Sequence, residues 1–121
     1  KRKIYKNYKK EMKGIKVQFN LDNKKFKNGF WATVINFDKK YMVNIPSLIK
    51  FLSKNSILSR QFFMPLSLQK AYKKFTYKNI KNENKVAYSL YKNSLVLPSH
   101  YNLTVKDISY ISKKIREYIN R

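Results

Sequence analysis

The chain has 121 residues, no cysteine, and 28 lysines and arginines against 6 acidic residues, a formal net charge of +22 at pH 7. This length fits one domain, and the lack of cysteine excludes disulfide frameworks, zinc knuckles and thiol catalysis. Hydrophobic residues make up 43% of the chain and aromatic residues 16%, so we expect a folded core despite the charge.

The positive charge has two interpretations. A basic surface is the electrostatic feature of a stand-alone nucleic-acid-binding module. Solvated lysine faces are the other interpretation, because the lysines are spread evenly and accompany many Asn, Ile and Tyr residues, as in A- and T-rich coding sequences. Arginine, which base-reading proteins favour, occurs only at Arg2, Arg60, Arg116 and Arg121.

No apolar run approaches the roughly 20 residues that a membrane-spanning helix needs. Residues 1–3 are basic and are followed by no apolar signal-peptide core. We therefore expect a cytoplasmic protein without a membrane partner.

The first predicted element is an amphipathic helix over residues 1–13. Ile4, Tyr8 and Met12 recur at helical spacing, and Gly14 is expected to end the helix. A second element is expected over residues 29–37, whose β-branched and aromatic side chains predict a strand buried on nearly both faces.

A turn at residues 38–40 leads to a second helix over 45–54. Asn44 is placed to cap this helix, with a proline at the favoured first turn. Its apolar positions share one face, which contains Leu48, Ile49 and Leu52.

The next predicted strand covers residues 59–64 and is stopped by Pro65. Residues 68–75 are predicted to form a loop with a helical turn, and residues 86–92 a short helix. An apolar strand follows at residues 95–97.

Pro98 closes that strand and a loop follows at residues 99–102. Thr104 and Asp107 have the spacing of a capping box, which predicts the start of the last helix. Apolar residues continue through that helix at helical spacing: Ile108, Ile111, Ile115 and Ile119.

These elements predict an α+β fold, a small sheet covered by helices on one side, within a single domain over residues 1–121. We expect Trp31, Phe62 and Phe63 in the core, as is usual for aromatic residues on strands. A base-stacking platform is the alternative for these three side chains.

The residues supply no self-contained active site. The acidic residues form no convincing catalytic pair, and His100 is the sole histidine, which excludes a histidine metal cluster. Gly14 and Gly29 are isolated, so neither a Walker loop nor a dinucleotide fingerprint is present. We therefore predict no catalytic and no metal-binding residue in this chain.

Two motifs carry a family resemblance. The first runs from the aromatic pair Phe30-Trp31 through a helix to Ser59-Arg60 and Pro65-Leu66. The second is Leu95-Val96-Leu97-Pro98 with the loop and closing helix that follow. In this order they resemble the C-terminal domain of the DegT/StrS-like, pyridoxal-phosphate-dependent nucleotide-sugar aminotransferases, with perosamine-synthase-like members most similar. The departures from the family pattern are Ser56 for glycine, Gln61 for proline and Ser67 for histidine.

The resemblance implies the small C-terminal domain of a fold type I, aspartate aminotransferase-like enzyme. Residues 1–14 would be the linking helix and residues 28–121 the small domain. A large N-terminal domain, absent from this chain, would bind pyridoxal phosphate (PLP) and supply the catalytic lysine, so the chain alone is expected to be inactive.

The implied reaction is amination of a keto sugar linked to a nucleotide, with glutamate as donor, for amino-sugar and cell-surface polysaccharide biosynthesis. The complete enzyme is expected to be a homodimer without a nucleic-acid partner. An inactive remnant of a split aminotransferase gene and the basic module remain alternatives.

The resemblance also implies substrate-binding residues. Arg60 matches the family's Ser-Arg position, where a guanidinium would hold carboxylate or phosphate oxygens, or form an interface salt bridge. His100 matches a loop that faces the active-site mouth, and its imidazole would contact a sugar hydroxyl. Ser67 replaces the histidine that many members carry, which alters the hydrogen bond at that position.

Overall fold

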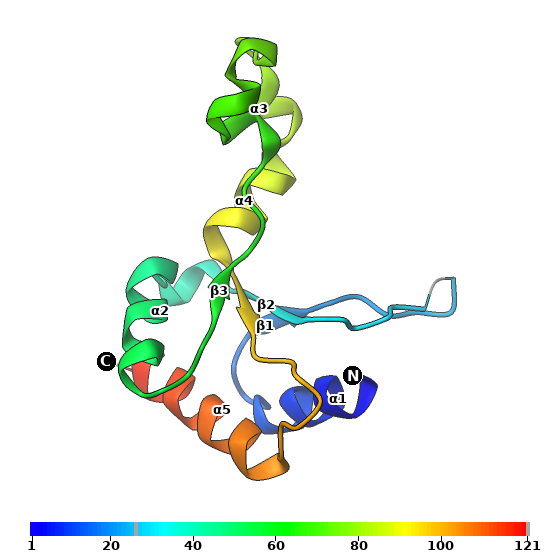
Figure 1. Ribbon diagram of the computed structural model, residues 1–121, viewed down its shortest axis with the longest axis vertical. Helices are drawn as coiled ribbons and strands as arrows, with labels where there is room; N and C mark the ends of the chain where they lie inside the picture. The colour runs from blue at the N-terminus through cyan, green and yellow to red at the C-terminus, as the bar shows by residue number, and fades with distance from the viewer. Residues whose placement is uncertain (26, 121) are drawn as a thin grey trace.

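The computed structural model describes residues 1–25 and 27–120, and Figure 1 shows a body of helices and sheet from which one helical segment projects. The α-helices are α1 (Arg2–Glu11), α2 (Ile45–Lys54), α3 (Ile80–Glu83), α4 (Lys85–Asn93) and α5 (Val105–Ile119). The strands are β1 (Val17–Phe19), β2 (Thr33–Phe37), β3 (Arg60–Gln61) and β4 (Ser94–Leu97), and the 3-10 helices are η1 (Lys39–Tyr41), η2 (Leu66–Leu68) and η3 (Lys70–Phe75).

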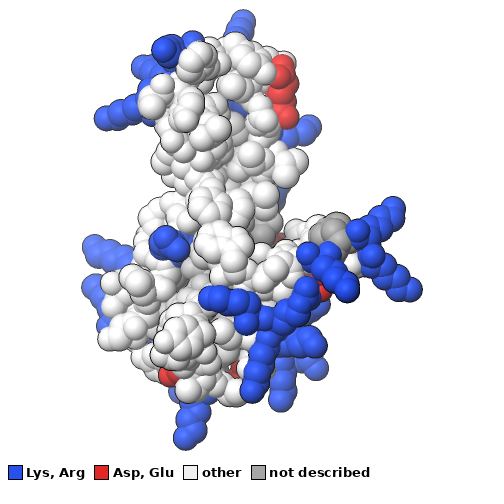
Figure 2. Space-filling view, turned by 45° about the vertical axis from the view of Figure 1, so that its right-hand side comes forward, with Lys and Arg blue, Asp and Glu red and all other residues white. Residues whose placement is uncertain are grey.

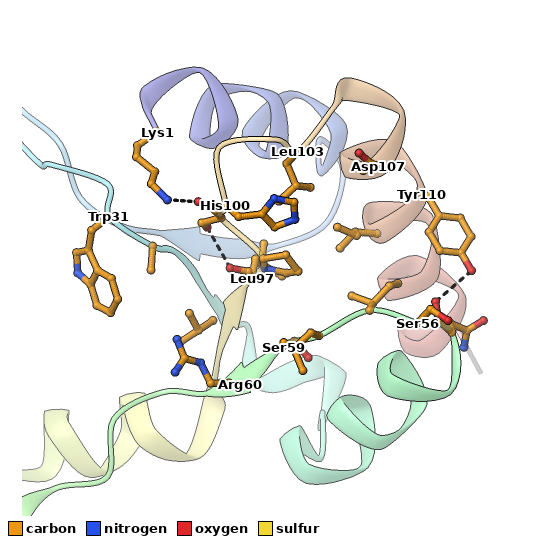
Figure 3. Close-up of a pocket in the computed structure, with 18 of the residues that line it drawn as sticks. Lys1, Trp31, Ser56, Ser59, Arg60, Leu97, His100, Leu103, Asp107 and Tyr110 are labelled. Atoms are coloured by element: carbon orange, nitrogen blue, oxygen red, sulfur yellow. Dashed lines mark hydrogen bonds between the residues drawn. The ribbon is translucent and has the colours of Figure 1, made fainter.

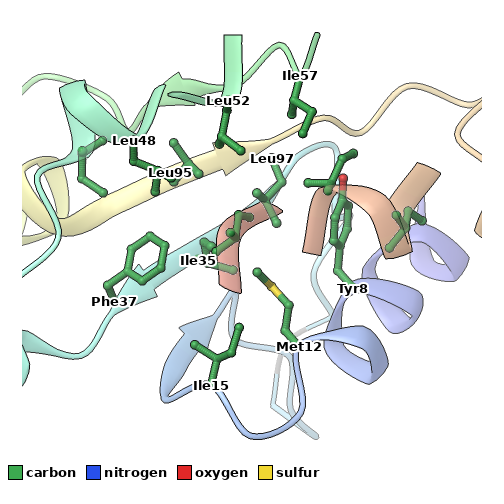
Figure 4. Close-up of a cluster of buried hydrophobic side chains, with 14 of the residues drawn as sticks. Tyr8, Met12, Ile15, Ile35, Phe37, Leu48, Leu52, Ile57, Leu95 and Leu97 are labelled. Atoms are coloured by element: carbon green, nitrogen blue, oxygen red, sulfur yellow. The ribbon is translucent and has the colours of Figure 1, made fainter. Parts of the chain in front are cut away.

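The described strands form one antiparallel sheet in the order β1-β2-β4-β3. Ile35 pairs with Leu95 and Thr33 with Leu97, so alternate residues of β2 and β4 share one face. Helices α1, α2 and α5 cover that face, and Figure 4 shows the resulting core. This arrangement confirms the predicted α+β fold. The core includes Tyr8, Met12, Ile35, Leu48, Leu52, Leu95, Leu97, Ile108 and Ile115.

Helices α1 and α5 pack against each other, as the buried Tyr8 and Ile115 indicate. Helix α1 ends before Gly14, whose φ of +86° lies in the region that glycine adopts without a Cβ clash. The Arg116 guanidinium donates to the carbonyls of Glu11 at 2.7 Å and Lys13 at 2.6 Å. A side chain of the last helix therefore satisfies the open carboxyl end of the first.

Both predicted helix caps are confirmed. The Asn44 side chain accepts a hydrogen bond from the Ser47 backbone N–H at 2.9 Å, and α2 starts at Ile45. In α5, the Thr104 hydroxyl accepts from the Asp107 N–H at 3.1 Å, and the Asp107 carboxylate accepts from the Thr104 N–H at 2.9 Å. This reciprocal pair is the capping box that the sequence predicted.

The strand predicted over residues 29–37 is too long, because β2 begins only at Thr33. Phe30 has a φ of +48°, a left-handed conformation that a strand cannot contain. The buried Phe30 ring stacks on Tyr5 with centroids 4.0 Å apart. Packing against a distant helix therefore holds the backbone out of the sheet at this point.

The strand predicted over residues 59–64 shortens to Arg60–Gln61. The Phe62 N–H still donates to the Ser94 carbonyl at 3.2 Å, after which the chain leaves the sheet. Strand β1 and the single turn α3 were not predicted, while the helical turn near residues 68–75 and the helix α4 are confirmed.

Residues 62–93 form a projection, here called the arm, that contains η2, η3, α3 and α4 and rises away from the body in Figure 1. No side chain within this part of the described chain is buried. Several large apolar side chains of the arm are exposed, including Phe63, Leu66, Leu68, Phe75 and Val86. The arm therefore has no core of its own.

The lysines lie mainly on the surface. Figure 2 shows Lys and Arg side chains gathered around the loop between β1 and β2, with little acidic surface beside them. Arg2 and Asp22 form an ion pair of 3.3 Å at the base of this loop. In the described part of the chain, no helix combines the length and apolar character that crossing a bilayer requires.

Candidate functional site

A cavity of about 1140 Å³ opens where β3, the end of β4 and the start of α5 meet, and Figure 3 shows its walls. Apolar residues of the sheet and of α5, such as Val96, Leu97 and Ile111, form its floor. The polar and charged residues that line the cavity are Lys1, Lys54, Asn55, Ser56, Ser59, Arg60, Ser99, His100, Asp107 and Tyr110.

Arg60 is presented to this cavity by the end of α2. The Ser56 N–H donates to the Ser53 carbonyl at 3.0 Å, and the Ile57 N–H to the Leu52 carbonyl at 2.9 Å. These two bonds form a Schellman motif, with Ser56 left-handed at φ +59°. The motif reverses the chain, which then enters β3 at Arg60.

The Arg60 side chain is exposed at the cavity wall, and β3 holds its backbone opposite Val96. Among the described residues, no carboxylate pairs with this guanidinium and no acceptor hydrogen-bonds to it. The neighbouring Ser59 is buried, and its hydroxyl has no partner within the same residues. The cavity wall therefore offers a free guanidinium, whereas the Ser59 hydroxyl is buried behind it.

The loop that carries His100 is fastened to the body by hydrogen bonds on both sides. The fully buried Tyr8 donates to the Pro98 carbonyl at 3.0 Å, and the Thr33 N–H donates to the Ser99 hydroxyl at 2.9 Å. The Lys1 ammonium donates to the Ser99 carbonyl. His100 is exposed and lines the cavity.

Asp107 is the one acidic residue in the described cavity wall, and its carboxylate is already engaged. The Thr104 hydroxyl donates to it at 2.7 Å and the Thr104 N–H at 2.9 Å. These hydrogen bonds hold the pKa of Asp107 below its ordinary value of 3.8, with a smaller contribution from the charge of His100. Lys1, Lys54 and Arg60 therefore leave the cavity with an excess of positive charge, which suits an anionic ligand.

The structure brings Arg60 and His100 to the same cavity, but not Ser67. Ser67 lies on η2 in the arm, where its hydroxyl is 2.6 Å from that of Tyr88 on α4. The Ser67 hydroxyl thus connects two segments of the arm.

The prediction that Trp31, Phe62 and Phe63 lie in the core is wrong, because Phe62 is only half-buried outside the core cluster and the other two rings are exposed. Trp31 is 63% exposed at the cavity wall and Phe63 is 62% exposed. Their rings stack with centroids 6.0 Å apart and an interplanar angle of 27°. The base-stacking alternative for Trp31, Phe62 and Phe63 requires exposed rings, and only Trp31 and Phe63 are exposed. Nothing in the sequence marked Ser59 as a cavity residue.

The residues 1–25 and 27–120 contain no group of three or more His, Cys, Asp or Glu side chains able to hold a metal ion. The cavity residues also do not fit PLP by themselves. A pyridine nitrogen needs a facing carboxylate, and Asp107 is committed to Thr104. A cofactor site would therefore require residues from outside this part of the molecule.

A sequence profile of the DegT/DnrJ/EryC1/StrS aminotransferase family matches residues 1–116. The GDP-perosamine synthase of Vibrio cholerae is 28% identical to this chain over 120 residues. That alignment covers 99% of this chain and 32% of the synthase.

Solved structures share the fold at lower identity. The sugar aminotransferase Spr1654 of Streptococcus pneumoniae superposes in its apo form with a TM-score of 0.85 at 19% identity, over 98% of this chain and 30% of that one. PseC of Helicobacter pylori, an aminotransferase of pseudoaminic acid biosynthesis, gives 0.81 at 18% identity, over 98% of this chain and 32% of that one. Spr1654 has also been solved in PLP and PMP forms. The chain spans about a third of the length of these relatives.

Proposed function

This chain belongs to the DegT/DnrJ/EryC1/StrS aminotransferase family, and on that premise we propose that it is the small C-terminal domain of a PLP-dependent nucleotide-sugar aminotransferase. The observation that carries the proposal is the share of its relatives' length that this chain covers. The family profile matches residues 1–116, yet the chain spans only 32% of the Vibrio cholerae relative. This coverage supports the proposal that a large domain completes the site.

The proposed partner of this chain is that large domain, and the arm has features that favour contact with a partner. Helices α3 and α4 have 4 and 9 residues, fewer than the roughly 12–15 that an isolated helix needs in water. Neither helix has a buried residue, so packing within this chain does not replace the missing stability. Exposed Phe75 and Val86 supply apolar surface for a partner to cover.

In the proposed enzyme the large domain holds PLP and the lysine that binds it, while PLP serves as the electron sink for transfer of an amino group. Arg60 binds a carboxylate of glutamate or a phosphate of the nucleotide-linked keto sugar, since its guanidinium is free and lies in a cationic cavity. His100 contacts a sugar hydroxyl from the opposite loop. Ser67 contacts substrate only if the arm reaches a substrate-binding site in the complete enzyme.

We further propose that the complete enzyme is a cytoplasmic homodimer that serves amino-sugar biosynthesis for cell-surface polysaccharide. No catalytic residue is assigned to this chain. Neither Lys1 nor Lys54 is placed for that role, because Lys1 is bonded to the Ser99 carbonyl and Lys54 lies exposed at the end of α2.

The test is to combine the chain with a large domain of this family, by co-expression or in one polypeptide, and to purify the product. The expected complex is yellow from bound PLP, loses that absorbance when glutamate is added, and aminates a keto-sugar nucleotide. The chain alone serves as control and should bind no PLP.

The contrasting result is a chain that binds neither the large domain nor PLP but is retained on RNA in a strongly salt-dependent manner. That result would establish the basic nucleic-acid-binding module instead. A complex that forms but neither takes up PLP nor aminates sugar would identify an inactive remnant.

A further inference from the structure

We propose that Trp31 and Phe63 form the stacking platform for the base of a nucleoside diphosphate whose phosphates bind at Arg60. The inference rests on the proposed function, because it assigns one part of the nucleotide-sugar substrate to one part of the cavity. It identifies the end of the substrate that this domain recognises.

Trp31 is held outward by the residue before it. The left-handed Phe30 turns its own ring inward against Tyr5, with a centroid distance of 4.0 Å, and the Arg2 guanidinium lies 5.2 Å from the Phe30 ring. The Asn28 side chain accepts from the Phe30 N–H at 2.8 Å. With Phe30 fixed on the inside, the following Trp31 side chain points to solvent.

Phe63 follows β3, which pairs with β4 on the side opposite to β2. The Phe62 N–H donates to the Ser94 carbonyl at 3.2 Å, which keeps the chain beside β4 for one residue beyond β3. Phe62 also contacts Phe63 edge-on, with centroids 5.3 Å apart. The two exposed rings are therefore supplied by separate segments that the sheet brings together.

The surroundings of this pair indicate the ligand. Trp31 and Arg60 line the same cavity, as Figure 3 shows, and Lys1 lies on the same wall. An exposed aromatic face attracts a planar base, and a free guanidinium attracts phosphate. A sugar alone has no aromatic face and a bare diphosphate gains nothing from one. A nucleoside diphosphate uses both features.

The sequence provides the probe, because Trp31 is the single tryptophan of the chain. The 121-residue chain is titrated with GDP, guanosine and inorganic pyrophosphate at submicromolar chain concentration, below the range in which it is expected to aggregate, and tryptophan fluorescence is recorded. GDP and guanosine should quench the emission, while pyrophosphate should bind without comparable quenching and compete with GDP. The affinities should also be confirmed by calorimetry on the complex with the large domain, in which the chain is expected to stay dispersed.

Three variants separate the contributions. Phe63→Leu should weaken GDP and guanosine binding about tenfold, because one stacking ring is lost. Arg60→Gln should weaken GDP and pyrophosphate but leave guanosine unchanged. Phe75→Leu removes an equally exposed ring from the arm and is the matched control, with GDP affinity unchanged.

The proposal is wrong if GDP at millimolar concentration neither quenches Trp31 nor releases heat, or if Phe63→Leu and Phe75→Leu weaken GDP binding equally. It is also wrong if Phe63→Leu leaves GDP affinity intact but reduces co-purification with the large domain, which would make the pair a domain contact.

The complete enzyme distinguishes this failure from failure of the proposed function. If the platform binds the base, Phe63→Leu should raise the KM for the keto-sugar nucleotide about tenfold and leave the KM for glutamate unchanged. An active aminotransferase with neither KM altered would reject the platform alone. Absence of any transamination in the wild-type complex would reject the proposed function.

Discussion

Ser56 is a residue whose backbone does not suit its side chain. It occupies the C′ position of the Schellman motif after α2 with a φ of +59°. A left-handed residue with a Cβ costs roughly 1–2 kcal/mol, and glycine avoids this cost while losing about 0.5–1 kcal/mol through chain entropy. The family pattern with glycine at this position thus has a conformational cause.

We therefore expect Ser56→Gly to raise the free energy of unfolding by about 0.5–1 kcal/mol in urea denaturation. Ser53→Gly is the control, since Ser53 lies inside α2 and glycine there should destabilise the protein. A loss of stability in both variants would contradict the conformational explanation.

Tyr8 links the buried core to the loop that carries His100. Its burial raises the pKa of the phenol above the ordinary value of 10.0, and the charge of Asp107 adds to the shift. Because the folded state favours the protonated phenol, the associated stability is present below pH 10 and is lost as the pH rises above it.

Tyr8→Phe should accordingly cost about 1 kcal/mol at pH 7, through loss of the hydrogen bond to the Pro98 carbonyl. It should also make the decline of stability above pH 10 shallower than in the parent protein. Urea denaturation from pH 7 to 11 measures both effects, and an unchanged alkaline decline would show that other groups cause it.

At the scale of the element, α5 depends on its capping box. Thr104→Ala should lower the free energy of unfolding by about 1 kcal/mol, and Thr104→Ser should retain most of it because the hydroxyl remains. Urea denaturation followed by circular dichroism provides the measurement. Equal stability of the Ala and Ser variants would argue against the cap.

The cap also depends on pH through Asp107. Since the folded pKa of Asp107 is lowered, the stability that the carboxylate contributes persists above pH 3.8 and disappears as the pH falls through the folded pKa.

The elements differ in how far the sequence predicts them. The caps at Asn44 and Thr104 were predicted because side chain and backbone partner are three residues apart. The start of β2 was not predicted correctly, because the conformation of Phe30 depends on its packing against Tyr5, 25 residues earlier in the chain. Strand β1 has only three residues and gains its stability from pairing with β2, which a local pattern does not reveal.

The candidate site shows the same division. Arg60 and His100 were predicted from motif order, and the structure places both at one cavity. Ser67 is separated from Arg60 and His100 because the arm projects away from the body. Trp31 is exposed because the chain turns at the left-handed Phe30. Both are properties of tertiary packing rather than of the residues in sequence.

At the scale of the whole molecule, the arm is an insertion into a β-hairpin. Strands β3 and β4 are antiparallel neighbours, and the Phe62 N–H still reaches the Ser94 carbonyl. A two-residue Asn-Gly turn in place of residues 63–93 would connect them directly. The body keeps its core in such a variant, because no buried side chain comes from the arm.

The intact chain alone is expected to aggregate at micromolar concentration in light scattering, because the apolar surface of the arm is uncovered. The variant with the Asn-Gly turn should be a monomer with native-like circular dichroism, and co-expression with the large domain should keep the intact chain dispersed. A clean monomer of the intact chain would contradict a role of the arm in aggregation.

The uncovered arm also makes the chain sensitive to proteases. A segment of 32 residues without a buried side chain opens at almost no cost, so cellular proteases can engage it whenever no partner covers it. In the proposed enzyme, contact with a large domain would shield the arm from cleavage. The rate of cleavage within residues 62–93 would then report whether that contact has formed.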